Sequence, residues 1–375
     1  MSPIDFDAAR CVVVKAGSSL LQAGPAVIQP IADDVAALRA RGVDVILVSS
    51  GAVALGRSRL GLPPGTLTLE QKQAAAAAGQ PRLLSAWDTA LSPHGVETAQ
   101  ALITLDVTES RRSWLNARAT LQTLLELGAV PVVNENDTIA TDEIRYGDND
   151  RLAARVAQLA GADILVLLSD VDGLYDADPR KDPAARKLHR IDRIDANIHA
   201  MAGSANAEAA VGTGGMRTKV MAAELAGSAG CATVIASGSS PRPVCGLTDP
   251  DRGSWFTPAR SAASARERWI AGVESPNGEI RIDAGAAAAL RAGKSLLPVG
   301  VTGVHGQFAR GDTVRITGPD GALIARGGCA YDYSDATRIA GCHSEEVEAR
   351  LGYRRTAALI HAADLVLAAA RETAP

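Results

Sequence analysis

The side chains best suited to chemistry are concentrated between positions 134 and 150, in the sequence NENDTIATDEIRYGDND. This stretch follows directly on the apolar run Ala129 to Val133, which is typical of a buried strand. Ligands in open α/β folds bind at the carboxyl ends of the strands. An acidic run by itself is more often a solvated surface loop, so its interpretation depends on the other motifs of the chain.

Two lysines lie in segments suited to phosphate. Lys15 follows the apolar run Cys11 to Val14 and precedes a small-residue turn, whose backbone N–H groups can meet phosphate oxygens. Residues 212–219, GTGGMRTK, stand at the expected start of a helix, where glycines let the backbone approach an anion. Each segment alone is also common as a strand end or surface loop. Together they predict phosphoryl transfer, which needs positioning and positive charge.

Residues 51–58, GAVALGRS, almost match the P-loop spacing GxxxxGK[ST]. Arg57 stands where lysine is required, and its guanidinium is bulkier and presents a different geometry. We therefore reject a P-loop. Ser50 and Gly51 are better candidates to hold a carboxylate substrate through hydroxyl and amide donors.

Metal ligation by the protein is not indicated. Asp170, Asp172, Asp176 and Asp178 suggest calcium, but their loop lacks the glycine and glutamate spacing of an EF-hand, so turn chemistry is the favoured explanation. The five cysteines are scattered and contain no CxxC pair, which argues against a zinc site and a disulfide framework.

Alternating strands and helices must position these residues. Strands are expected at 11–14, 43–48, 98–105, 129–133, 164–168 and 232–236, and helices at 29–41, 69–91, 113–127, 151–160 and 216–226. Small or polar residues follow each strand, and a parallel sheet gathers them at one edge. The predicted fold is a three-layer αβα open, mainly parallel sheet.

The pattern of apolar residues along the sequence changes near residue 253. We expect 254–270 to be a connection with some helix, and from Glu279 short alternating runs are separated by glycine-rich turns, as in a small β-barrel. The predicted division is a catalytic domain at 1–260, a linker at 261–275, a barrel at 276–365 and a tail at 366–375.

Composition narrows the function classes. The 375 residues carry 38 Lys and Arg against 42 Asp and Glu, which argues against a polyanion as main partner. Aromatic residues are only 3%, too few for broad base-stacking platforms. The acidic start MSPIDFDAAR is unlike a signal peptide, and no apolar run approaches about 18 residues. We expect a cytoplasmic protein without a membrane span.

Taken in order, VVVKAGSSLL, VSSGAVALG, VPVVNENDTIAT, GDND, LLSDVDGLYDADP and GTGGMRTK resemble the motifs of the glutamate 5-kinases within the amino acid kinase family. Residues from Glu279 to about Asp364 resemble the PUA domain of many bacterial members. Single fragments are shared with aspartate, carbamate, acetylglutamate and uridylate kinases. NENDTIAT with GDND, and the appended PUA domain, narrow the resemblance to the glutamate enzymes.

The resemblance implies ATP-dependent phosphorylation of the L-glutamate side-chain carboxylate to γ-glutamyl phosphate, the first step of proline biosynthesis. Lys15 and Lys219 would neutralise the transferring phosphoryl group, with Asp150 orienting them. The nucleotide would contact Lys15, Ser169, Asp170, Thr213, Gly214, Gly215, Met216, Arg217, Thr218 and Lys219. Glutamate would contact Ser50, Gly51, Asn134, Asp137 and Asn149. Mg²⁺ is expected on the phosphates, so no protein ligand is assigned.

The resemblance also implies homo-oligomers and feedback inhibition by proline. Because acyl phosphates hydrolyse readily, we expect hand-off to glutamyl phosphate reductase. The barrel segment from Glu279 to Asp364 carries ten basic and ten acidic residues, whereas RNA binding normally needs a basic face, so a structural or regulatory role is favoured. The alternatives are a kinase of another small acid, such as aspartate, carbamate or acetylglutamate, and a non-catalytic RNA-binding or regulatory protein.

Overall fold

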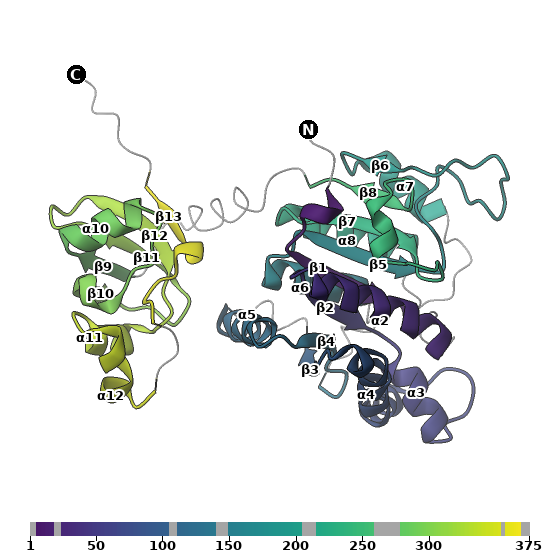
Figure 1. Ribbon diagram of the computed structural model, residues 1–375, viewed down its shortest axis with the longest axis horizontal. Coiled ribbons are helices and arrows are strands. Elements are labelled where there is room, and N and C mark those ends of the chain that lie inside the picture. Colours follow the sequence, from purple (N-terminus) through teal and green to yellow (C-terminus); the bar gives the residue numbers. More distant parts are fainter. Residues whose placement is uncertain are drawn as a thin grey trace. The chain divides into compact units, whose positions relative to one another are not determined.

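The computed structural model describes residues 5–18, 24–104, 111–139, 149–204, 215–258, 278–353 and 357–368. The chain divides into two compact units, Met1–Ala262 and Ala263–Pro375 (Figure 1). Within the described part, no helix combines the length and apolarity that a membrane crossing requires.

The larger unit is built on an eight-stranded sheet, counted over the described residues, with strand order β3-β4-β2-β1-β5-β7-β8-β6. The strands are β1 (Cys11–Ala16), β2 (Asp44–Ser49), β3 (Thr98–Ile103), β4 (Val130–Glu135), β5 (Ile164–Ser169), β6 (Arg190–Ile191), β7 (Ala232–Ser237) and β8 (Ser254–Phe256). All pairs are parallel except β7 with β8. The expected mainly parallel sheet is confirmed.

The assignment of residues 254–256 to a connection is wrong. They form β8, which lies antiparallel to β7 with Trp255 opposite Val234. Three residues are too few to show a period of two, so this strand is defined by its pairing with β7 and β6.

The helices of this unit are α2 (Pro25–Ala40), α3 (Ala52–Arg59), α4 (Leu69–Leu91), α5 (Arg111–Glu126), α6 (Asn149–Ala160), α7 (Ala196–Ser204) and α8 (Met216–Ser228). The bounds of α4 are those predicted, because a capping box marks its start: Thr68 and Gln71 each accept a backbone hydrogen bond from the other. The short helices α3 and α7 were not predicted.

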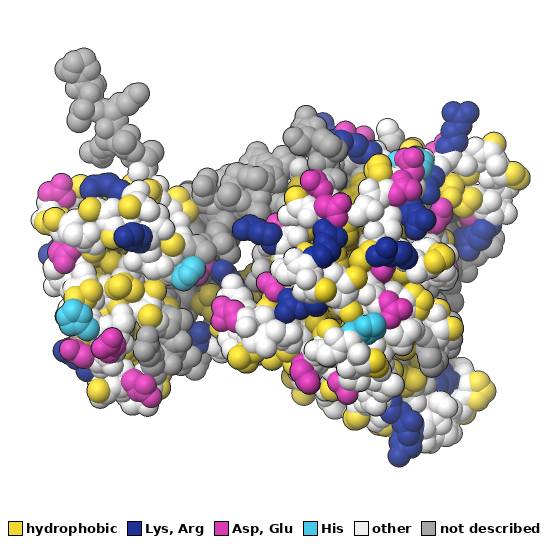
Figure 2. Space-filling model, viewed as in Figure 1, with side chains coloured by type: hydrophobic (Ala, Val, Ile, Leu, Met, Phe, Trp, Pro, Cys, Tyr) yellow, Lys and Arg dark blue, Asp and Glu magenta, His cyan; other side chains and the backbone are white. Residues whose placement is uncertain are grey.

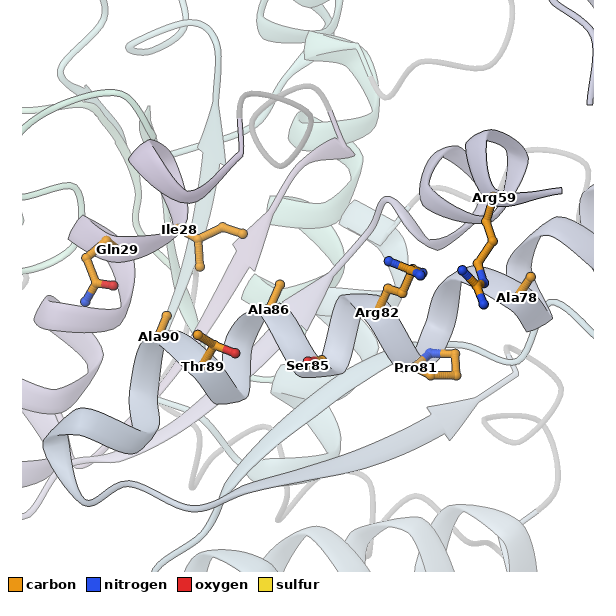
Figure 3. Close-up of a pocket in the computed structure, with 10 residues that line it drawn as sticks. All are labelled: Ile28, Gln29, Arg59, Ala78, Pro81, Arg82, Ser85, Ala86, Thr89 and Ala90. Carbon is orange, nitrogen blue, oxygen red and sulfur yellow. The ribbon is translucent and has the colours of Figure 1, made fainter. Parts of the chain in front are cut away.

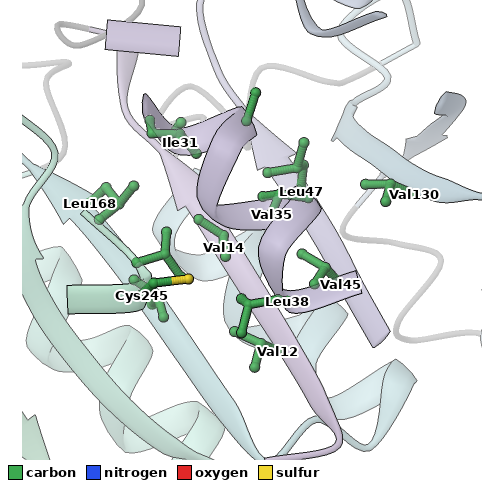
Figure 4. Close-up of a cluster of buried hydrophobic side chains, with 14 of the residues drawn as sticks. Val12, Val14, Ile31, Val35, Leu38, Val45, Leu47, Val130, Leu168 and Cys245 are labelled. Atoms are coloured by element: carbon green, nitrogen blue, oxygen red, sulfur yellow. The ribbon is translucent and has the colours of Figure 1, made fainter. Parts of the chain in front are cut away.

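Helices cover both faces of the sheet, which gives three layers (Figure 1), and an apolar cluster lies on each face. On one face α2 packs on alternate strand residues, including Val12 and Val14 (Figure 4), and α4 joins the same cluster. On the other face α5, α6 and α8 pack on the intervening residues, including Val13. Because side chains alternate along a strand, Lys15 lies on the same face as Val13. It therefore points toward the layer that contains α6 and α8.

Helices α3 and α4 cross at two glycines. A Cβ added to Gly56 would lie 1.7 Å from the carbonyl oxygen of Ala75, and one added to Gly79 would lie 1.8 Å from that of Ala52. Arg57 donates to the carbonyl groups of Pro63 and Gly65. The glycine of the near-P-loop spacing thus serves helix packing, and its arginine holds a neighbouring loop.

The smaller unit contains a five-stranded sheet among its described residues, with order β10-β9-β11-β12-β13. Its strands are β9 (Gly278–Ile282), β10 (Val301–Gly306), β11 (Thr313–Thr317), β12 (Leu323–Gly328) and β13 (Leu365–Leu367), and its helices are α10 (Ala284–Arg291), α11 (Tyr333–Ile339) and α12 (Val347–Leu351). It has its own apolar core. The helices were not predicted, although Asp283 caps α10 through the N–H of Ala286 at 2.7 Å, a recognisable start signal.

We expect Gly79→Ala to lower the free energy of unfolding by about 1–3 kcal/mol or more, because a methyl group there overlaps backbone that cannot rotate away. Chemical denaturation measures the change. Gly203→Ala in α7 is the matched control, since among the described residues no atom beyond its own helix backbone and chain neighbours lies within 4 Å of its added Cβ, and alanine favours a helix. Equal stability of both variants would contradict this account of the crossing.

Candidate active site

Two lysines and one aspartate meet at the carboxyl end of β1. The ammonium nitrogen of Lys15 lies 2.5 Å from Oδ1 of Asp150, and that of Lys219 lies 3.1 Å from Oδ2. Their side chains are 6%, 5% and 0% exposed for Lys15, Lys219 and Asp150. Three elements distant in the sequence thus deliver three charged groups to one buried point.

Local structure explains each position. Alternation along β1 turns Lys15 toward the α6–α8 face. Asp150 and Lys219 lie in the first turns of α6 and α8. A carboxylate is favoured near a helix amino end and a lysine is not, so Asp150 offsets the unfavourable placement of Lys219. The Thr218 hydroxyl lies 3.0 Å from Asp150 Oδ2 and 2.7 Å from the carbonyl oxygen of Gly215, beside the same pair.

The electrostatics keep Asp150 ionised. Burial by itself would raise the pKa of its carboxyl, but the charges and hydrogen bonds of Lys15 and Lys219 outweigh burial and hold the pKa well below its usual range. Counted over the described residues, two ammonium groups face one carboxylate here, an excess of positive charge in a buried place. Such a site attracts an anion strongly, because few waters screen it.

The predicted acceptor residues lie on the β2 and β4 side of β1. Ser50 follows β2 and donates from its hydroxyl to the carbonyl of Ala16 at 3.1 Å. Gly51 has φ +103°, a left-handed conformation that glycine adopts freely and that starts α3. Both residues therefore lie just after β2, and Ser50 is tied to the strand that bears Lys15.

Asn134 and Asn149 connect β4 to α6. The Asn149 amide donates to Asn134 Oδ1 at 2.9 Å, and both residues are buried. Asp137 follows β4 in a turn, and burial raises the pKa of its carboxyl to about 6. The link from Asn134 to Asn149 ends one residue before Asp150, so the β4 edge and the charged cluster are joined.

The predicted nucleotide residues lie on the other side of β1, at β5 and α8. Ser169 ends β5; its hydroxyl donates to Asp170 Oδ1 at 3.0 Å, and its backbone carbonyl accepts from the N–H of Gly238 at 2.8 Å. The Met216 side chain is buried in the core, whereas Arg217 is exposed. Thr213 and Gly214 lie outside the described residues.

The aspartates after β5 take part in turns and ion pairs. Asp172 accepts from Lys187 at 3.2 Å and from the Tyr175 hydroxyl at 3.0 Å, and Asp178 pairs with Arg180. Across the described residues, no group of three or more His, Cys, Asp or Glu side chains is placed to hold a metal ion.

A cleft of about 690 Å³ lies away from these residues, on α2, α3 and α4 (Figure 3). Arg59, Arg82 and Ile28 are among its lining residues, and none of the predicted site residues is. The cleft therefore does not mark the chemistry of the charged cluster.

Comparisons with known proteins give the family of the chain. The model of the amino acid kinase family matches residues 10–237. The chain belongs to the amino acid kinase family. The PUA domain model matches residues 278–351, within the smaller unit. Both parts of the resemblance drawn from the motifs are thereby confirmed.

Relatives match over nearly the full length of this family member. It is 55% identical to "Glutamate 5-kinase" of Caulobacter vibrioides over 97% of this chain and 98% of that one. It is 57% identical to the protein of the same name from Dinoroseobacter shibae, over 96% and 99%. It is 54% identical to that of Rhizobium etli, over 96% and 93%. A kinase of this family uses ATP.

Reasoning from sequence missed three buried residues whose side chains form hydrogen bonds at the ends of β2 and β4. They are Ser49 at the end of β2, and Gln80 and Trp87 on α4. The spacing of Gln80 and Trp87 was the available signal, because two side chains with hydrogen-bonding groups seven positions apart lie on one face of a helix.

We expect Asp150→Asn to lower the free energy of unfolding by about 3–5 kcal/mol, because two buried ammonium groups lose their compensating charge. The folded pKa of Asp150 lies below its unfolded value. The difference from wild type is therefore full above about pH 4 and shrinks at lower pH.

Urea denaturation at several pH values measures this difference. Asp172→Asn is the matched control, because the Asp172 side chain is 51% exposed and its ion pair with Lys187 contributes about 1 kcal/mol or less. Similar decreases in the free energy of unfolding of the two variants would show that the charge of Asp150 stabilises the fold no more than an exposed ion pair does.

Proposed function

We propose that this chain phosphorylates the side-chain carboxylate of L-glutamate with ATP, giving γ-glutamyl phosphate as the first step of proline biosynthesis. The observation that carries the proposal is the convergence of Lys15 and Lys219 on Asp150. It lies between one set of strand ends suited to an amino acid and another suited to a nucleotide. The high identity to proteins named glutamate 5-kinase supports glutamate as the acceptor.

The reaction needs no general base from the protein. A glutamate side chain has an ordinary pKa of about 4.3, so its carboxylate is already ionised at neutral pH and can attack directly. The protein's contribution is electrostatic. Lys15 and Lys219 hold positive charge where negative charge accumulates on the transferred phosphoryl oxygens, and Asp150 fixes both ammonium groups before reaction, so little reorganisation is needed.

The acceptor side offers groups of the right kind for an amino acid. Asp137 supplies a carboxylate for the substrate ammonium group. The Gly51 N–H supplies a donor for a carboxylate, and the Ser50 hydroxyl supplies a second when it turns from the Ala16 carbonyl to which it donates here. Asn149 and Asn134 orient one another through their 2.9 Å hydrogen bond, which fixes their amide groups at the edge of the charged cluster.

Magnesium fits this site as an ion carried by the nucleotide. Because no carboxylate cluster within the described residues is placed to hold it, Mg²⁺ would be bound mainly by phosphate oxygens, as is usual for this ion. When bound, it adds further positive charge at the phosphates, complementing that of Lys15 and Lys219.

The PUA-like unit is assigned a structural or regulatory role. On the face drawn in Figure 2, acidic and basic side chains are interspersed over this unit, and its charges balance over the whole segment. Homo-oligomer formation, inhibition by proline and hand-off of the product to a reductase remain part of the proposal on the strength of the family resemblance.

We expect the purified chain, incubated with ATP, Mg²⁺ and hydroxylamine, to form hydroxamate from L-glutamate, because hydroxylamine traps acyl phosphates. Aspartate, N-acetylglutamate and carbamate form the comparison panel. Lys219→Ala is the control for contaminating kinases, since it should lose most turnover. Preferential reaction with another acid would refute glutamate as the acceptor.

We expect kcat/KM for glutamate to fall about fourfold as the pH is lowered from about 7.5 to about 5.5. The reason is that Asp137, with its pKa raised to about 6 by burial, loses its negative charge over this range and no longer attracts the substrate ammonium group. Initial rates at subsaturating glutamate measure the profile. Asp137→Asn should be slower and should lack this inflection; an unchanged inflection would assign it to another group.

A further inference from the structure

We propose that α4 positions the acceptor pocket through two buried side chains, Trp87 and Gln80, which act as positioning residues for glutamate binding. This inference rests on the proposed function, because it concerns the same pocket. Neither side chain belongs to the predicted acceptor residues. Each side chain instead bonds the last residue of a strand, β2 or β4, at whose end the predicted acceptor residues lie.

Trp87 holds the end of β2. Its side chain is fully buried, and its indole N–H donates to Ser49 Oγ at 2.8 Å. Ser49 is also fully buried and is the last residue of β2. Its hydroxyl, which already accepts from the indole, is directed at the Ser50 carbonyl at 3.5 Å, the outer limit of a hydrogen bond. The Trp87 side chain of α4 therefore fixes the orientation of Ser49, the residue before Ser50.

Ser50 is in turn held by β1. Its backbone N–H and its hydroxyl both lie within reach of the Ala16 carbonyl, at 3.3 Å and 3.1 Å. Ala16 directly follows Lys15 on β1. The indole of Trp87 thus supports a turn that connects the candidate acceptor residues to the strand bearing a candidate catalytic lysine.

Gln80 holds the end of β4 in the same way. Its amide nitrogen donates to the backbone carbonyl of Glu135 at 3.4 Å, and its amide oxygen accepts from Gln100 of β3 at 3.3 Å. Glu135 is the last residue of β4, between Asn134 and Asp137. Gln80 and Trp87 are two helical turns apart and therefore share one face of α4. A single helix supports both acceptor strands.

The two strands that Trp87 and Gln80 support, β2 and β4, are neighbours in the sheet, and the candidate acceptor residues lie at their ends. The nucleotide candidates belong to β5 and α8, which α4 does not support by any of these bonds. Loss of the Trp87 or Gln80 bonds should therefore displace acceptor groups selectively. A side chain with a purely structural role would instead reduce stability and all kinetic constants together.

Trp87→Phe tests the proposal directly. We expect the KM for glutamate to rise about 3- to 10-fold, the range that one lost buried hydrogen bond corresponds to, while the KM for ATP stays within about twofold. Trp255→Phe is the matched control. Trp255 is also buried in the core on this side of the sheet, but its indole nitrogen has no partner among the described residues.

Ser49→Ala and Gln80→Met extend the test with smaller changes in volume. Each should reproduce the selective rise in glutamate KM. The double variant Trp87→Phe, Ser49→Ala should be no worse than the more affected single variant, because both remove the same bond. Thermal unfolding of every variant separates this effect from a general loss of stability.

The outcomes distinguish the two proposals. A wild-type chain that forms no hydroxamate from glutamate would overturn the proposed function and this inference with it. An active wild type in which Trp87→Phe behaves like Trp255→Phe, or in which both KM values rise together, would overturn the positioning role alone.

Discussion

The buried ion cluster of Lys15, Asp150 and Lys219 is the constraint on which the rest of the larger unit depends. Removing three charged groups from water is costly, and mutual attraction offsets that cost only when the geometry is well defined. In the part of the chain that the structure describes, two ammonium groups share one carboxylate, which gives the cluster a positive surplus. The fold therefore has to hold β1, α6 and α8 in fixed relation, and that same surplus is what a phosphoryl group would neutralise.

The strand order of the sheet explains how one cluster can serve two ligands. β1 lies between β2 and β5, so the end of β1 has acceptor candidates on one side and nucleotide candidates on the other. Alternation along β1 sends Lys15 to the face covered by α6 and α8, while Val12 and Val14 anchor α2 and α4 on the opposite face. A shift of one residue in the register of β1 would reverse this assignment and bury the lysine against the wrong helices.

Helix α4 contributes from that opposite face. Its glycine contact with α3 lets the two helices approach closely behind the turn that carries Ser50 and Gly51. Farther along, its polar side chains reach the ends of β2 and β4. The site is thus shaped from both layers of helices, one that supplies charge and one that supplies support.

The sequence by itself determined the class of the fold, because the strand and helix periods are strong and strand ends such as Val133 to Asn134 are sharply polar. It also determined the motifs from which the family was identified. Tertiary structure decided what depends on pairing between distant segments: that Ser254 to Phe256 completes the sheet, and that Gly56 meets α4 rather than a phosphate. The family resemblance already implied that Asp150 orients both lysines, but no local pattern records which side chains meet when strands and helices pack. Only tertiary structure brings the three side chains together, at 2.5 Å and 3.1 Å.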